Sequence, residues 1–166
     1  LWAAEELQSV PLEAEHHVPG VIEAEASLGM QIEDFSLQAI TGKDYRLSDF
    51  AEKPVLVVIF MGYECPLVQL YASRLVELEQ QYRSQGVAVV AVKSNQQDSI
   101  LELKHLAQKH WIEFPLSKDP GNVVADQFGA ARTPEIYVLD QDRKVRYRGG
   151  IDDQFGIDFQ RPEPTR

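Results

Sequence analysis

Two long apolar runs, residues 54–60 (PVLVVIF) and 86–95 (GVAVVAVKSN), constrain the fold of this chain most strongly. The first is a continuous β-branched run, which is typical of a strand buried on both faces of a sheet, and the second predicts another buried strand. Between them, apolar residues recur at helical spacing, and Gly86 follows the last turn. The apolar positions that predict a core-facing stripe on this helix are Leu67, Leu70, Tyr71, Leu75, Leu78 and Tyr82.

The flanking segments complete an α/β pattern. Residues 33–50 predict a strand, a turn, a second strand and a short helical turn capped by Ser48 or Asp49. A second helix should start at a cap formed by Asp98 or Ser99. After it come a short strand, a helix that ends at a glycine, and a hairpin, in residues 114–119, 120–129 and 135–149. Strands that alternate with helices predict an α/β domain with a central mixed sheet flanked by helices, preceded by an N-terminal β-hairpin extension.

Acidic residues are concentrated at the start of the chain. Residues 1–33 contain seven of the acids that give the net charge of -10, and they contain no Lys or Arg. Such a charge argues against nucleic acids and anionic membranes as partners, and no run approaches the roughly 20 apolar residues that span a bilayer. We expect a leader or linker in residues 1–27, a domain in 28–153, and an extended tail in 154–166 that leads to further chain. The adjacent His16 and His17 in the leader are expected to be solvated rather than metal ligands, so no metal is predicted.

The chain begins with Leu1 rather than methionine, which suggests a processed or trimmed piece of a longer protein. Removal of an export signal and a cloning boundary both explain such a start. Export, to a periplasmic or other extracytoplasmic location, is our expectation for this chain.

Cys65 is the only cysteine, so a disulfide within the chain is impossible. It follows a predicted buried strand and opens a predicted helix, where α/β sheets place their ligands and where helix amides favour a thiolate. Pro66 fits the first turn of that helix because it has no N–H to leave unpaired. The adjacent Glu64 opposes the thiolate by like-charge repulsion. The alternative is that Cys65 is a small buried apolar residue.

Several motifs together resemble the thioredoxin-like superfamily, in its redoxin and AhpC/TSA branch of peroxiredoxin-like proteins. The matching segments are DFSL (34–37), TGKDYRLSDF (41–50), KPVLVVIF (53–60), ECPL (64–67), RTPEIYVLD (132–140) and YRGGIDD (147–153). The resemblance covers about residues 28–153 and implies a thioredoxin-like fold. It also implies that Thr133-Pro134 is a cis-proline loop packed against the active cysteine, which is Cys65.

The chain departs from the family pattern at Gly62. This glycine occupies the first position of the Cys-x-x-Cys motif and also the threonine position of the peroxiredoxin Thr-x-x-Cys motif. The resemblance places the substrate beside Gly62, Tyr63, Glu64, Thr133 and Pro134. Arg132 is the only charged candidate for a catalytic partner of Cys65, and the alternative is a solvated surface arginine.

The sequence is consistent with two different functions. The first is a thiol redox protein that uses one cysteine, needs no cofactor, and reduces a peroxide or disulfide with an external thiol as resolving partner. The second is a degenerate thioredoxin-like module that binds an extended peptide or serves as one part of a larger multidomain protein.

Overall fold

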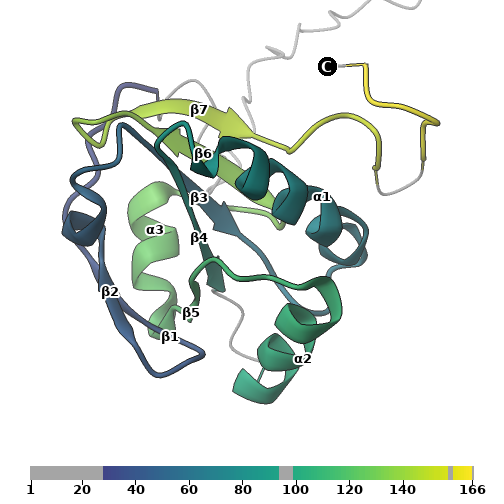
Figure 1. Cartoon of the computed structure of the whole chain (residues 1–166), viewed down its shortest axis with the longest axis horizontal. Helices are drawn as coiled ribbons and strands as arrows, with labels where there is room; N and C mark the ends of the chain where they lie inside the picture. Colours follow the sequence, from purple (N-terminus) through teal and green to yellow (C-terminus); the bar gives the residue numbers. More distant parts are fainter. Residues whose placement is uncertain (1–27, 94–98, 157–158, 166) are drawn as a thin grey trace, which may run out of the picture.

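The computed structural model describes residues 28–93, 99–156 and 159–165, which contain a single seven-stranded sheet. The strand order is β2-β1-β5-β4-β3-β6-β7 (Figure 1). The strands are β1 (Ser36–Ala39), β2 (Asp44–Arg46), β3 (Val55–Phe60), β4 (Val87–Lys93), β5 (Leu116–Lys118), β6 (Glu135–Leu139) and β7 (Val145–Gly149). The helices are α1 (Pro66–Arg83), α2 (Ile100–His110) and α3 (Val123–Phe128), with 3₁₀ turns η2 (Leu47–Phe50) and η3 (Pro120–Asn122).

The sheet is mixed, as the sequence predicts. Strands β3, β4 and β5 run parallel at its centre, with β3 and β4 in register from Val55 opposite Val87 to Phe60 opposite Val92. On one side the antiparallel hairpin β6-β7 pairs with β3, and on the other the antiparallel hairpin β1-β2 pairs with β5. The N-terminal hairpin extension is therefore confirmed, and the carboxyl end of β3 lies at the centre of the sheet.

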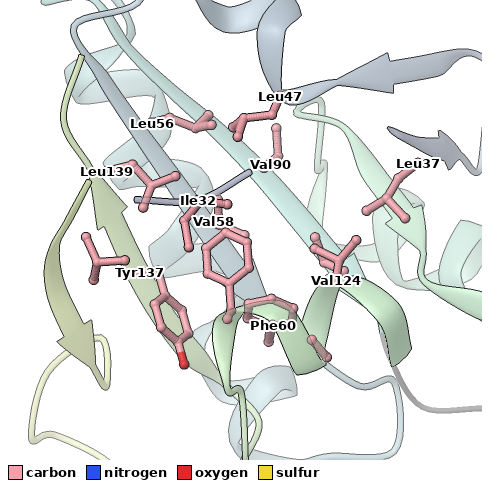
Figure 2. Close-up of a cluster of buried hydrophobic side chains, with 14 residues drawn as sticks. Ile32, Leu37, Leu47, Leu56, Val58, Phe60, Val90, Val124, Tyr137 and Leu139 are labelled. Carbon is pink, nitrogen blue, oxygen red and sulfur yellow. The ribbon is translucent and has the colours of Figure 1, made fainter. Parts of the chain in front are cut away.

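The helices cover both faces of the sheet and create two apolar cores. Helix α3 lies on one face, while α1 and α2 lie on the other (Figure 1). Because side chains alternate along a strand, Leu56, Val58 and Phe60 of β3 join the α3 core, which Figure 2 shows, whereas Ile59 joins the α1 core. Leu56 and Val58 are fully buried and Ile59 is 1% exposed, so β3 is buried on both faces as predicted.

The buried side of α1 agrees with the prediction only in part. Tyr71 and Leu75 are buried as expected, whereas Leu70 and Tyr82 are 51% and 39% exposed. The other buried positions of the helix are Val68, Ala72 and Glu79. This stripe includes a glutamate because Arg83 donates to both oxygens of Glu79, at 2.7 and 2.8 Å, and hydrophobicity alone does not reveal such a pair.

The helix caps agree with the prediction in one case and differ in the other. Ser99 caps α2 and accepts a hydrogen bond from the Glu102 amide, while Asp98 lies outside the described residues. The predicted cap of η2 is wrong, because Arg46 is the cap residue. Asp49 lies inside the turn and accepts from the Arg46 amide, and Ser48 donates to Asp34 instead.

The start of the described chain is tied to the sheet. Gly29 donates to the Val145 carbonyl and Val145 donates to the Met30 carbonyl, which joins the start of the domain to β7. We propose that the domain begins at residue 28. The acidic leader, with His16 and His17, lies outside the described residues. In the part of the chain that the structure describes, no helix is long and apolar enough to cross a membrane.

Candidate functional site

Cys65 lies between the end of β3 and the start of α1. It is the N-cap residue of the helix, one position before the first helical turn, with φ -72° and ψ 117°. Its side chain makes no capping hydrogen bond. The half-buried Sγ instead donates to the Thr133 carbonyl oxygen at 3.1 Å. The expected helix junction is therefore present, but in this structure a carbonyl on another loop, and not the helix amides, makes the contact with the sulfur.

The turn before Cys65 sets the surroundings of the thiol. Cys65 donates its amide to the Gly62 carbonyl at 3.3 Å, so residues 62–65 form a tight turn. Gly62 is buried, Tyr63 is half-buried and Glu64 is exposed. The Glu64 carboxylate is thus placed toward water, where the screening of its charge is strongest.

Residues of α1 and α2 hold this turn from the helical side. Gln69 donates through Nε2 to the Tyr63 carbonyl at 3.0 Å, and the Tyr63 hydroxyl lies 3.2 Å from Nδ1 of His105. Oε1 of Gln69 accepts from Nζ of Lys109 at 3.0 Å. Burial lowers the pKa of His110, which lies beside the same oxygen, and the charge of Lys109 lowers it further. Gln69, which the sequence did not single out, therefore links the cysteine turn to α2.

The Thr133-Pro134 bond is cis, as predicted. The loop that contains it connects α3 to β6 and places the Thr133 carbonyl against Cys65, 68 residues earlier in the chain. Of the expected site residues, the structure joins Cys65 directly to Thr133, and it places Gly62, Tyr63 and Glu64 in the adjoining turn.

A buried ion pair binds the backbone of this loop, which spans residues 129–134. Nε of Arg148 donates to Oε1 of Glu135 at 2.9 Å, and the two side chains are only 3% and 2% exposed. Oε2 of Glu135 accepts from the Ala131 amide at 2.9 Å, and Nη2 of Arg148 donates to the Gly129 carbonyl at 2.5 Å. The pair thus binds two backbone groups of the loop, and a charge-assisted network of this kind holds its partners firmly.

This pair is not among the residues that the sequence motifs single out, although the sequence contains a signal for it. Arg148 lies opposite Tyr137 in the β6-β7 hairpin, and Glu135 is two residues before Tyr137, so all three side chains share one face. Arg148 also lies over the Tyr137 ring, 5.4 Å from its centroid. Burial, and then the charge of Glu135, raises the pKa of Tyr137 to about 12, so its hydroxyl remains neutral at pH 7.

Arg132 lies on the same loop but is 65% exposed, with Nε 3.8 Å from Oε1 of Glu135. Its guanidinium is thus placed beside the buried pair. The side chain also lines a cavity of about 300 Å³, together with Thr133. Arg132 thus belongs to the loop that contacts Cys65, and its role as a catalytic partner stays a prediction.

Comparisons with known proteins agree with this arrangement. The model of the AhpC/TSA family matches residues 28–148. The thiol-disulfide oxidoreductase ResA of Bacillus cereus is 25% identical over 123 residues, which are 74% of this chain and 69% of that protein. The chloroplastic peroxiredoxin Q of Triticum aestivum is 28% identical over 135 residues, which are 77% of this chain and 61% of that protein.

Two solved structures show the same arrangement of strands and helices. An uncharacterized conserved protein from Geobacillus kaustophilus has a TM-score of 0.72 and 35% identity, and the match covers 76% of this chain and 70% of that one. The thioredoxin domain of a thiol-disulfide oxidoreductase from Bacteroides vulgatus has a TM-score of 0.64 and 15% identity, with coverage of 73% and 86%.

Proposed function

This chain belongs to the AhpC/TSA family of the thioredoxin-like superfamily, and we propose that it is a thiol-based redox protein that works with Cys65 alone. Its relatives include proteins named thiol-disulfide oxidoreductase and peroxiredoxin. Membership of this family therefore supports a substrate with a reducible S–S or O–O bond. The partner that completes the reaction is an external thiol, because the sequence holds one cysteine.

The observation that carries the proposal is the contact between the Cys65 sulfur and the loop carbonyl of Thr133. It places the only thiol of the chain at the carboxyl end of the central strand β3, opposite the backbone of a loop. Open α/β sheets bind their ligands at this position. Thr133 and Pro134 then form one wall of the proposed substrate site, and Gly62, Tyr63 and Glu64 form the other.

The proposed reaction with a disulfide has two steps. Cys65 loses its proton to solvent, and the thiolate attacks one sulfur of the substrate; a Cys65–substrate disulfide forms, the substrate S–S bond breaks, and the leaving thiolate takes up a proton. An external thiolate then attacks the substrate sulfur of this mixed disulfide, and the bond between that sulfur and Cys65 breaks. Attack at the substrate sulfur releases Cys65 as a thiolate, with a new disulfide between the two external groups.

With a peroxide, the thiolate attacks one oxygen, the O–O bond breaks, and the leaving hydroxide or alkoxide takes up a proton. Cys65 becomes a sulfenic acid, which one external thiol converts to a mixed disulfide with release of water. Gly62 supplies no hydroxyl to hold the peroxide, and this absence favours the disulfide as substrate.

The test is incubation of the reduced protein with glutathione disulfide. We expect one glutathionyl adduct per chain, located on Cys65 by peptide mass spectrometry, which persists until a second thiol is added, because no internal thiol resolves it. The Cys65→Ser variant is the control and should gain no adduct. If wild-type protein remains unmodified under conditions that modify a free model thiol, the proposal is wrong and the module that only binds partners is favoured.

A further inference from the structure

A cavity of about 300 Å³ lies beside the loop that contacts Cys65. Its lining residues are Phe60, Asn122, Ala125, Ala130, Ala131, Arg132 and Thr133. Thr133 is shared by the cavity and the cysteine site, because it lines the cavity and its carbonyl oxygen accepts a hydrogen bond from the Cys65 sulfur. The volume is at the lower end of that found for small-molecule sites, so the cavity suits a compound of a few heavy atoms.

The charges around the cavity leave one positive charge uncompensated. Arg132 and Arg148 carry two positive charges, and Glu135 carries one negative charge. Glu135 is engaged at 2.9 Å by Arg148, whereas its closest approach to Arg132 is 3.8 Å. Asp119, three residues before Asn122, is 3% exposed and accepts from two amides of α3, at 3.1 and 2.9 Å. Arg132 is 65% exposed and its pairing with Glu135 is long, at 3.8 Å, so its guanidinium can also contact an anion that enters the cavity.

The other residues that line the cavity are mostly small, and one of them, Asn122, is polar. Three alanines leave the space open, and Asn122 contributes a side-chain amide. Asn122 has φ 60°, a left-handed conformation that asparagine tolerates better than most residues. A guanidinium and the Nδ2 group of an asparagine that line one cavity can both donate to a carboxylate, and the guanidinium does so through charge-assisted hydrogen bonds.

We propose that this cavity binds the carboxylate of the small thiol or disulfide that reacts with Cys65, with Arg132 and Asn122 as the specificity-determining residues. The inference rests on the proposed function and gives its substrate class: a low-molecular-weight disulfide with a carboxylate a few bonds from its sulfur. Thr133 lines the cavity and accepts from the Cys65 sulfur, and this shared residue is the link through which a carboxylate held at Arg132 would bring the substrate sulfur to Cys65. The bond exchange is that of the disulfide reaction already described.

The test compares two disulfides with each variant. Dithiodipropionate bears carboxylates, and hydroxyethyl disulfide is its uncharged counterpart; the ratio of their rates of mixed-disulfide formation at Cys65 cancels changes in thiol reactivity. We expect the ratio to fall about tenfold in Arg132→Gln, the effect of one charge-assisted hydrogen bond. Arg132→Lys should retain part of the preference, because the charge remains without the fork. Asn122→Gly removes the amide, keeps the left-handed backbone accessible, and should lower the ratio by a smaller factor.

The matched control is Arg46→Gln, which removes an exposed arginine on β2 at the edge of the sheet and should leave the ratio unchanged. A ratio that is the same in wild type, Arg132→Gln and Arg46→Gln, while both disulfides react, would overturn the cavity assignment and leave the redox function standing. Failure of both disulfides to modify Cys65 in the wild-type protein would instead overturn both proposals.

Discussion

Replacing Arg148 by methionine should lower the free energy of unfolding by about 3–5 kcal/mol, because the change leaves the Glu135 carboxylate buried without its buried, hydrogen-bonded cationic partner. Glu135 is 2% exposed, so water cannot replace the lost hydrogen bond without opening the structure. The same change removes the hydrogen bond to the Gly129 carbonyl and so loosens the loop that faces Cys65. Urea unfolding followed by fluorescence or circular dichroism measures the effect.

A neighbouring arginine provides the control. Arg146 is on the same strand, but it is 59% exposed and pairs with Asp140 at the surface. Arg146→Met should cost only about 0–1 kcal/mol, the usual value for an exposed ion pair. The double variant Arg148→Met with Glu135→Leu should recover much of the stability that the single change loses, since no unpaired charge remains. Equal effects of the Arg148 and Arg146 changes would show that the buried pair does not stabilise the loop.

Replacing Gly62 by cysteine should convert the chain from a protein that cannot form an internal disulfide into one that does. The hydrogen bond from the Cys65 amide to the Gly62 carbonyl closes a four-residue turn. The two Cα atoms of such a turn lie within about 7 Å, which falls close to the range of Cα separations seen in disulfides. After oxidation and rapid alkylation, mass spectrometry should find no free thiol in Gly62→Cys.

The control for this change is Gln80→Cys, which adds a second thiol on the exposed side of α1. Two alkylated thiols should remain after the same treatment of the monomeric protein. If Gly62→Cys also keeps two free thiols, then Gly62 does not occupy the first position of a Cys-x-x-Cys site, and the alignment of the motif with the family is wrong.

The parts of the fold that depend on local pattern could be predicted from the sequence. The β-branched run of β3 fixes a strand buried on both faces, and the Ser99 cap marks the start of α2. The buried side of α1 could be predicted only in part: Tyr71 and Leu75 are buried as expected, but the helix also buries Glu79 while Leu70 is exposed. Glu79 is buried in a pair with Arg83, and apolar spacing does not contain that information.

The candidate site, too, could be predicted from the sequence only in part. The position of Cys65 at a strand–helix junction and its approach to Thr133 follow from the motifs, together with the order of the strands. The support from Glu135 and Arg148 depends on which residues of two strands share a face, and hence on the register of the β6-β7 hairpin. The direction of the Cys65 sulfur, toward a carbonyl rather than the helix amides, is a matter of one side-chain torsion, which a sequence pattern does not encode.

The most direct test of the central claim is the rate at which glutathione disulfide forms a mixed disulfide with Cys65 in the folded chain relative to the same chain unfolded in urea. Intact-protein mass spectrometry counts the adduct, which forms as the S–S bond of the substrate breaks. The unfolded chain is the ideal reference because it has the same sequence and the same single thiol. We predict faster adduct formation in the folded protein, since the fold creates the reactive site. Slower adduct formation in the folded protein than in urea would show that the structure protects Cys65, and would contradict a redox role for it.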